Sequence, residues 1–188
     1  MKLLRIFRRT GQPLALSMAG VRMGDRLLML GCGDPLLIAQ LAVKTGLTGR
    51  AFAADVRRDR TAEAERLAPL EGALIETATA PWTALPLDAG VFDVAVIRHV
   101  FPGIADAERI GCATEVMRVL RPGGRCVVID LAKRPVLGGL VNRVALDPGY
   151  GARGGAVGVL EAGGFRAARL LASRDGFTFS EAARPNQW

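Results

Sequence analysis

Two glycines flank a cysteine directly after an apolar run, and an aspartate ends the next apolar run of the chain. The turn Gly31-Cys32-Gly33 follows residues 26–30, and Asp55 stands 22 residues beyond Gly33. Glycine lets a backbone approach a ligand closely, and the N-terminus of a following helix offers free N–H groups. An acidic side chain after the second strand can accept both hydroxyls of a ribose. The spacing therefore indicates a nucleoside site. The alternative is that the glycines only shape a tight turn and that Asp55 caps a helix.

A second group of candidates follows the apolar run 92–97. His99 is the only histidine of the chain, and an imidazole with an ordinary pKa near 6.5 suits a general base for a phenol, enol or amine. The alternative is a structural hydrogen bond at the strand end. Arg98 contacts an anionic ligand or forms an ion pair. Phe101 and Tyr150, the sole tyrosine, are candidate substrate contacts.

Cysteine usage gives no sign of a metal centre. Cys32, Cys112 and Cys126 are an odd number at wide spacings, and the chain has a single histidine. Such a pattern is neither a disulfide framework nor a set of zinc ligands. We therefore expect no metal and a reducing, cytoplasmic setting. The opening residues lack an apolar signal-peptide core, which agrees with that expectation.

The elements that must position these residues alternate between short apolar runs and helical stretches. Near-continuous apolar runs of this kind are typical of a parallel sheet covered on both faces. We predict an α/β fold with a Rossmann-like, mostly parallel, seven-stranded sheet, helices on both faces and a C-terminal antiparallel hairpin around an Asp-Gly turn. The expected strands are 26–30, 50–55, 73–75, 92–97, 125–131, 165–172 and 177–182, and the expected helices are 36–44, 57–67, 107–120 and 156–162.

Domain organisation follows from the same pattern. Residues 26–184 are expected to form one domain, preceded by a basic segment with a leading helix over 1–25. Residues 133–155 are rich in glycine and carry Tyr150, so we expect a loop or a lid there.

Composition excludes two broad classes of protein. The chain has 188 residues, of which 50% are hydrophobic and 23% charged, which is typical of a globular domain and not of a disordered chain. No apolar run reaches the roughly 18 residues of a membrane-spanning helix. The net charge is +7, and residues 1–26 carry five of these positive charges. The charge therefore points less to nucleic acid than to a short basic segment, in which residues 2–9 either contact an anionic membrane surface or pack over the active site.

Several of these segments together resemble a known family. The chain is similar to class I S-adenosylmethionine-dependent methyltransferases, of the small-molecule type that includes quinone-biosynthesis methyltransferases. The resemblance covers about residues 16–184. Its most specific part is the run R-V-L-R-P-G-G preceded by F-D-V-A-V. The segments that carry it are LLMLGCGDP (27–35), AFAADV (51–56), ALPLDAGVFDVAVIRHVF (84–101), EVMRVLRPGGRCVVID (115–130) and GFRAARLLASRDGFTFSEA (164–182).

The resemblance implies S-adenosyl-L-methionine as the cofactor. By this likeness Gly31 and Gly33 pass under its methionine part, and Asp55 holds its ribose. Cys32, Trp82 and Arg98 are further candidate contacts of the cofactor. The chain also departs from the family pattern at three positions. Met29 stands where an acidic residue is usual, Pro35 where a third glycine is usual, and Pro81 in the stretch that usually carries the acidic residue for the adenine. Beside Pro81, Trp82 either stacks on the purine or packs under its loop.

We therefore expect an enzyme that moves a methyl group to an O, N or C nucleophile of a small hydrophobic molecule. One alternative is a cofactor-binding protein of the same fold with weak or no activity, which the three departures motivate. A second alternative is an RNA or protein methyltransferase, which the charge motivates. The oligomeric state does not follow from the sequence.

Overall fold

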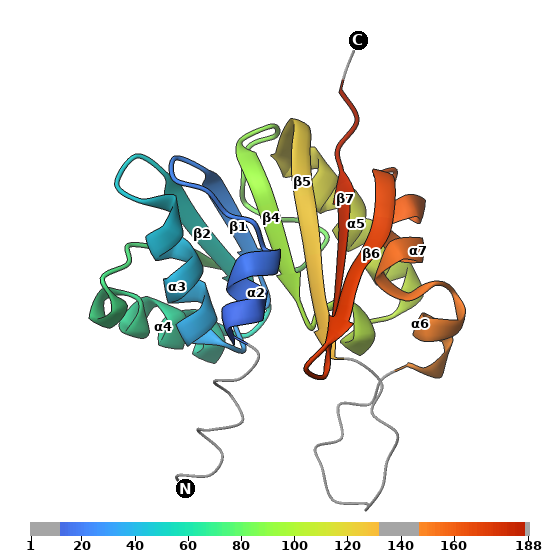
Figure 1. Cartoon of the computed structure of the whole chain (residues 1–188), viewed down its shortest axis with the longest axis horizontal. Coiled ribbons are helices and arrows are strands. Elements are labelled where there is room, and N and C mark those ends of the chain that lie inside the picture. Colours follow the sequence, from blue (N-terminus) through green and yellow to red (C-terminus); the bar gives the residue numbers. More distant parts are fainter. Residues whose placement is uncertain (1–11, 132–146, 187–188) are drawn as a thin grey trace, which may run out of the picture.

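A seven-stranded sheet forms the centre of the computed structural model, which describes residues 12–131 and 147–186. The strand order is β3-β2-β1-β4-β5-β7-β6, and every pairing is parallel except the two that β7 makes. Figure 1 shows β2, β1, β4, β5, β7 and β6 side by side in this order. The predicted fold class is thus confirmed. The strands are β1 (Arg26–Leu30), β2 (Arg50–Asp55), β3 (Glu76–Thr79), β4 (Phe92–Arg98), β5 (Leu120–Leu131), β6 (Arg166–Arg174) and β7 (Phe177–Ala183).

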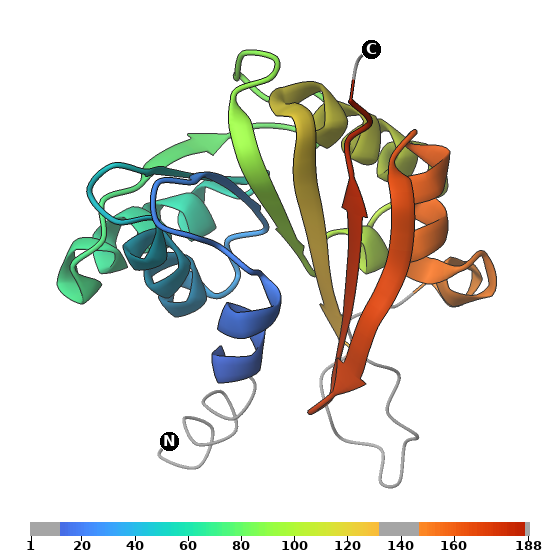
Figure 2. The same ribbon diagram turned by 45° about the horizontal axis from the view of Figure 1, so that its top comes forward.

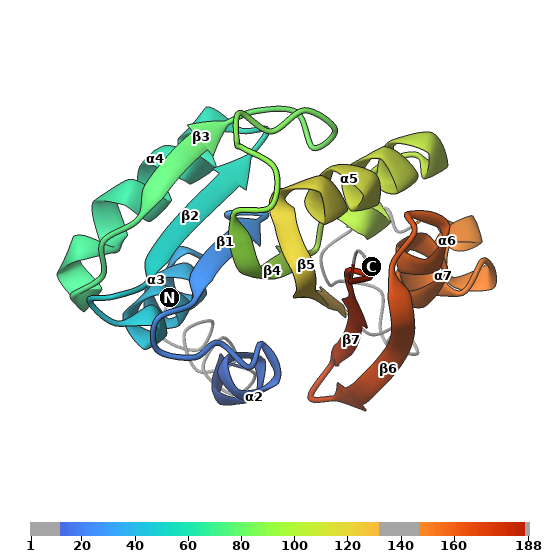
Figure 3. The ribbon, with the colours of Figure 1, turned by 90° about the horizontal axis from the view of Figure 1, so that it is seen from above.

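Helices cover both faces of the sheet, as Figures 2 and 3 show. The helices α2 (Gln12–Met18), α3 (Pro35–Thr45) and α4 (Arg58–Leu67) lie on one face, and α5 (Asp106–Val119) and α7 (Gly155–Ala162) lie on the other. Alternate residues of a strand point to opposite faces. Leu27 and Met29 of β1 accordingly pack in the cluster with α3, whereas Leu28 and Leu30 pack in the cluster with α5. This two-sided burial explains why the strands have near-continuous apolar runs.

The sheet brings the candidate residues to one edge. β1, β2, β4 and β5 run parallel, so their carboxyl ends meet at the same edge of the sheet. After β3, at one edge of the sheet, the chain returns to β4 on the other side of β1. The strand order therefore reverses between the neighbours β1 and β4. Ligands of open α/β sheets bind outside the carboxyl ends of the strands at such a point.

The predicted third strand, 73–75, was wrong. The strand is Glu76–Thr79, and Leu74, which looks like a strand residue, is 86% exposed. β3 lies at an edge of the sheet and bonds to α4 through polar groups, since Thr79 meets Thr61 at 3.0 Å and Thr77 donates to Glu65 at 2.5 Å. A strand held in this way does not need an apolar sequence. The apolar residues 73–75 therefore indicated a strand at the wrong place.

The segment expected as a loop or lid is partly helical. The short helix α6 (Pro148–Ala152) lies within 133–155, and α7 begins at Gly155, one residue before its predicted start. Asp147 caps α6 by accepting a hydrogen bond from the N–H of Gly149 at 2.8 Å. The rest of the expected lid, 132–146, and the basic segment 2–9 lie outside the described residues.

The C-terminal hairpin forms as predicted. β6 and β7 are joined by Asp175 and Gly176, which have φ angles of 54° and 81°. Positive φ at both central residues is the mark of a type I′ turn, for which Asp-Gly is a preferred sequence.

The connection between β3 and β4 is not a helix. Residues 80–91 form turns, and Trp82 and Leu85 fill the space over the sheet. Among the described residues, no helix combines the length and the apolar character needed to cross a bilayer.

Candidate active site

The first loop glycine is required by the fold itself. Gly31 has a φ of +92°, and a Cβ there would overlap the carbonyl oxygen of Arg98. The N–H of Gly31 bonds to the carbonyl of Ala54 at 3.0 Å, so this residue joins the ends of β1, β2 and β4. The alternative that the glycines only shape a tight turn therefore accounts for Gly31.

The second loop glycine has no such explanation. A Cβ at Gly33 would meet no atom of the described residues closer than the guanidinium of Arg60, at 3.9 Å, and its φ lies outside the positive region. Ordinary van der Waals contact of this kind would admit alanine. The bare backbone at Gly33 is thus open to a ligand, which is the use of glycine that a close approach requires.

Asp55 is fully buried at the end of β2, and three groups surround its carboxylate. Its Oδ2 accepts from the N–H of Cys32 at 2.7 Å, and its Oδ1 accepts from the N–H of Arg57 at 2.9 Å. Arg57 is the N-cap residue of α4, so Asp55 bonds before the helix rather than inside its first turn. The carboxylate therefore ties the glycine turn to β2.

Arg60 covers this carboxylate from the solvent side. Its Nη1 lies 3.5 Å from Asp55 Oδ2, and its side chain is 42% exposed. The same guanidinium is the group nearest to Gly33. An ion pair of a half-exposed arginine contributes little energy, so moving Arg60 off the carboxylate would cost little.

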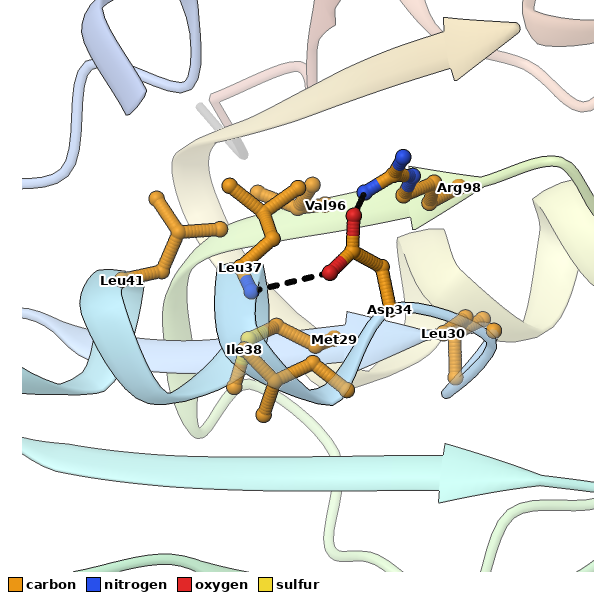
Figure 4. Close-up of a pocket in the computed structure, with 9 residues that line it drawn as sticks. Met29, Leu30, Asp34, Leu37, Ile38, Leu41, Val96 and Arg98 are labelled. Atoms are coloured by element: carbon orange, nitrogen blue, oxygen red, sulfur yellow. Dashed lines mark hydrogen bonds and ion pairs between the residues drawn. The ribbon is translucent and has the colours of Figure 1, made fainter. Parts of the chain in front are cut away.

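A pocket opens between β1, β4 and the start of α3 (Figure 4). Asp34 and Arg98 face one another there, with Arg98 Nη1 at 2.5 Å from Asp34 Oδ2. The other oxygen of Asp34 caps α3 by accepting from the N–H of Leu37 at 3.2 Å. Beyond this polar pair the walls are mostly apolar, with side chains from Met29, Leu30, Leu37, Ile38, Leu41 and Val96.

His99 adopts a left-handed backbone conformation directly after β4, with a φ of 53°. Its ring stacks on Phe177, with centroids 5.8 Å apart, and its Nδ1 is buried without a hydrogen-bond partner among the described residues. Burial and the neighbouring Arg98 guanidinium together lower the pKa of His99 from 6.5 to about 4. The imidazole is therefore neutral at pH 7.

Other predicted residues lie away from this pocket. Trp82 is 5% exposed, and Phe101 is completely buried in the same apolar cluster. This location matches the packing alternative for Trp82, and its stacking on a purine stays a prediction. Cys32 is buried, and burial with the charge of Asp55 raises its pKa to about 12, so the thiol is protonated.

A buried polar cluster at the end of β5 was missed in the sequence, apart from Tyr150. Tyr150 donates to Asp130 Oδ2 at 2.6 Å, and Arg109, which lies over the Tyr150 ring at 4.9 Å, donates from Nε to the carbonyl of Phe101 at 2.7 Å. Burial raises the pKa of Asp130 to about 6. Asp130 ends a buried strand as Asp55 does, and that position was a usable signal. Arg109 gave no signal, because a single arginine in a helix is ordinarily exposed.

Metal-ligating groups do not gather in this part of the molecule. Within residues 12–131 and 147–186, no three His, Cys, Asp or Glu side chains lie close enough to hold a metal ion. The three cysteines are buried free thiols.

Comparison with known proteins gives the family. Residues 28–128 match the methyltransferase domain, a stretch that runs from β1 into β5 and contains the glycine turn, Asp55 and the pocket. This match covers more than half of the 188 residues, so the chain belongs to the methyltransferase-domain family. The resemblance described from the sequence is thereby confirmed.

Two curated relatives and one solved structure illustrate the likeness. Demethylmenaquinone methyltransferase of Thermus thermophilus is 36% identical over 140 residues, covering 73% of this chain and 60% of the relative. The chloroplastic 2-phytyl-1,4-beta-naphthoquinone methyltransferase of Arabidopsis thaliana is 30% identical over 129 residues, covering 66% of this chain and 49% of the relative. The chain thus spans about half to three fifths of these relatives. An Aquifex aeolicus SAM-dependent methyltransferase shares the fold at a TM-score of 0.75 and 20% identity, covering 92% of this chain and 89% of the other.

Proposed function

We propose that this protein transfers a methyl group from S-adenosyl-L-methionine to a small hydrophobic acceptor that resembles a reduced quinone ring. The observation that carries the proposal is the match of residues 28–128 to the methyltransferase domain. The names of the curated relatives, which are quinone methyltransferases, support the acceptor class. Of the possible acceptor atoms O, N and C, a ring of this kind offers carbon and oxygen.

The residues of the glycine turn fit an adenosylated amino acid. Gly33 offers bare backbone, and Asp55 stands beside it at the end of β2. A carboxylate has about four lone-pair sites. That of Asp55 accepts hydrogen bonds from two backbone N–H groups and lies beside the half-exposed guanidinium of Arg60. Movement of Arg60 exposes Oδ2 to the ribose hydroxyls. We therefore assign the turn Gly31-Cys32-Gly33 and Asp55 to the cofactor, with Gly31 required for the shape of the turn and Gly33 for contact with the ligand.

The segment after β4 supplies the groups that face the acceptor. When bound, the cofactor supplies a methyl group on a positively charged sulfur, which an acceptor atom displaces in line. His99 is neutral at pH 7, since its pKa is about 4, and its Nδ1 has no partner among the described residues. It is thus able to accept the proton that a phenol or its ring carbon loses. Tyr150 contacts the acceptor in this proposal, and Trp82 supports the adenine side from the core.

Two further properties belong to the same proposal. The free, buried cysteines support a cytoplasmic setting, because an oxidising compartment favours disulfides. The basic residues 2–9 are proposed to contact an anionic membrane surface, where a hydrophobic acceptor concentrates.

The experiment is a methyl-transfer assay on the purified chain with S-adenosylmethionine and a panel of naphthohydroquinones, benzohydroquinones, phenols and amines. The proposal expects a methylated product from at least one hydroquinone, identified by mass, and none from an RNA or peptide panel. Cofactor binding without any product would instead support the non-catalytic alternative. Absence of both binding and product would refute the proposal.

A His99→Asn variant tests the proposed base. Asparagine tolerates the left-handed backbone of position 99. We expect turnover to fall about 100-fold, while the affinity for S-adenosylhomocysteine stays within about twofold of the unmodified protein by calorimetry. Turnover equal to that of the unmodified protein would remove His99 from the mechanism.

A further inference from the structure

Asp130, at the end of β5, is a buried carboxylate that few groups stabilise. The residue is 3% exposed. Its Oδ2 accepts from the hydroxyl of Tyr150 at 2.6 Å, and its Oδ1 has no hydrogen-bond partner among the described residues. A buried charge is costly unless it is paired and hydrogen-bonded, and burial raises the pKa of this carboxyl to about 6. A neutral Asn would accept the same bond from Tyr150 at lower cost, so stability does not explain the charge.

The carboxylate determines the direction of the single proton of the Tyr150 hydroxyl. Burial and the charge of Asp130 raise the pKa of Tyr150 above its ordinary value, so the hydroxyl is protonated at pH 7. A phenol has one O–H donor, and here the proton is donated to Asp130. An ionised carboxylate only accepts hydrogen bonds. The Tyr150 oxygen therefore has only lone pairs left to offer, and any further partner of this hydroxyl must itself be a donor.

Arg109 fixes the tyrosine ring from another side. Its guanidinium lies 4.9 Å from the centre of the Tyr150 ring, an arrangement in which the aromatic face attracts a cation. Arg109 is fully buried and is itself held in place, since its Nε donates to the carbonyl of Phe101 at 2.7 Å and its Nη1 pairs with Asp147, the cap of α6, at 2.9 Å. The tyrosine is thus held between α5, α6 and the end of β5 before any ligand binds.

This cluster lies beside the segment that carries His99. The carbonyl of Ile129, the residue before Asp130, accepts from the N–H of His99 at 3.0 Å. β4 and β5 are parallel neighbours, so their carboxyl ends lie at the edge of the sheet where ligands of this fold bind. Tyr150 is only partly buried, unlike Asp130 and Arg109, and its ring packs against an apolar cluster. Of these three residues, Tyr150 is therefore the one that presents surface to an apolar ring bound at this edge.

We propose that Tyr150, oriented by Asp130 and Arg109, accepts a hydrogen bond from a hydroxyl group on the acceptor ring. Tyr150 is the residue that determines specificity, and Asp130 and Arg109 are positioning residues that act through it. A reduced quinone or a phenol carries such a hydroxyl. An oxidised quinone carries a carbonyl oxygen instead, and two acceptors that face each other leave both unpaired. The cluster thus selects the reduced form of the acceptor. This inference rests on the proposed function and names the residues that recognise the ring oxygen.

The test measures the binding of two stable bicyclic probes by calorimetry, with S-adenosylhomocysteine present at saturation. 1-Naphthol carries a hydroxyl that donates, whereas 1-tetralone carries at the same ring position a carbonyl oxygen that only accepts. A buffer of about pH 7.5 keeps Asp130 ionised, because its pKa is about 6. The quantity compared is the ratio of the two dissociation constants, because a general weakening of the site lowers both affinities alike.

Two variants and one matched control enter the comparison. Tyr150→Phe removes the hydroxyl and keeps the ring. Asp130→Asn keeps the shape, but the amide, unlike a carboxylate, can also donate to the Tyr150 oxygen and so free the tyrosine proton. The control, Asp106→Asn, removes another carboxylate that pairs with Arg109, one that takes no hydrogen bond from Tyr150. Circular dichroism and melting confirm that each variant is folded.

We expect the unmodified protein to bind 1-naphthol about tenfold more tightly than 1-tetralone. In Tyr150→Phe the ratio falls to about unity, because 1-naphthol loses its partner. In Asp130→Asn the ratio falls by more than about threefold, because Tyr150 can now donate to the carbonyl of 1-tetralone. In Asp106→Asn the ratio stays within about twofold of the unmodified protein.

Two contrary results are distinguishable. If the unmodified protein binds the probes but prefers 1-naphthol by less than about threefold, or if either variant leaves the ratio within about threefold or the control changes it as much as the variants do, the inference is overturned and the proposed function stands. If the unmodified protein binds neither probe, the acceptor class of the proposed function fails together with the inference.

Discussion

Asp130 is buried and His99 is half-buried at the ends of the adjacent strands β5 and β4, and burial shifts their pKa values in opposite directions. Burial raises the pKa of Asp130 from 3.8 to about 6, against the lowering effects of Tyr150 and Arg109. Burial and the charge of Arg98 lower the pKa of His99 from 6.5 to about 4. The charged form of each residue is therefore disfavoured in the folded state, and each makes stability depend on pH.

Replacing Asp130 by Asn is expected to stabilise the protein at neutral pH. Because the folded pKa lies above the unfolded one, the aspartate costs nothing below about pH 4, and its penalty grows until about pH 6. The amide keeps the shape and an acceptor for Tyr150 but carries no charge. We expect a gain of about 1–3 kcal/mol in the free energy of unfolding at pH 7 and almost none at pH 4, measured with urea.

The exposed Asp88→Asn is the control for this prediction and should change stability by less than about 0.5 kcal/mol at either pH. A loss of stability in Asp130→Asn at pH 7 would contradict the burial argument.

His99 is expected to act on stability with the opposite sign. Its folded pKa lies below the unfolded one, so the unmodified protein loses stability from this residue as the pH falls from about 6.5 to 4. The His99→Asn variant lacks that contribution, so its melting temperature should fall less over the same interval. Melting curves at half-unit steps of pH provide the measurement. Parallel curves for the two proteins would show that His99 is not held neutral by the fold.

The two glycines of the turn between β1 and α3 are expected to differ, with Gly31 required by the fold and Gly33 by the ligand. Gly31→Ala places a Cβ against the Arg98 carbonyl in a backbone region that alanine rarely adopts. We expect it to lower the free energy of unfolding by about 2–4 kcal/mol. Gly33→Ala should melt within about 2 °C of the unmodified protein, yet weaken S-adenosylhomocysteine about tenfold or more, because the methyl group stands on the ligand side of the turn.

Melting and calorimetry of the two variants decide this comparison. A Gly33→Ala protein that binds the ligand normally would assign both glycines to the fold alone.

At the element scale, much of the sheet could be predicted because buried parallel strands have a simple apolar signature. The runs that became β1, β2 and β4 are of this kind, and the Asp175-Gly176 turn carries its own backbone requirement. β3 escaped prediction because polar bonds to α4 hold this edge strand. α6 escaped because it is only five residues long, and its cap at Asp147 sits inside a glycine-rich stretch.

The residues of the candidate site likewise include some that the sequence could predict and some that it could not. Gly33 and Asp55 were predicted as site residues from their positions after strands, which is a local property of the sequence. The Asp34–Arg98 pair joins residues 64 positions apart, and its formation depends on how β4 lies against α3. Likewise, the low pKa of His99 depends on burial and on its charged neighbour, and neither quantity is visible in residue type and spacing.

At the scale of the whole molecule, the described residues add few elements to the sheet and the helices that cover its two faces. Residues 80–91, which connect β3 to β4, form turns over the sheet rather than a helix. The match to the methyltransferase domain occupies residues 28–128. The site thus lies between elements of one sheet edge. A ligand that bridges β1, β2 and β4 there should stabilise the molecule as a unit.

Saturating S-adenosylhomocysteine is therefore expected to raise the melting temperature. At 100 times its dissociation constant, a ligand specific for the folded state adds about 2.7 kcal/mol, which corresponds to roughly 5–11 °C for a domain of this size. Adenosine alone, which lacks the amino-acid end, should give a smaller shift. The absence of any shift at millimolar S-adenosylhomocysteine would count against a cofactor site.

The most direct test of the proposed cofactor site is a crystal structure of the chain with S-adenosylhomocysteine. We predict that the ligand lies against the backbone of Gly33, with its ribose on Asp55 after Arg60 has moved aside. A ligand bound at another place, or an empty glycine turn with Arg60 still covering Asp55 at saturating ligand, would contradict it.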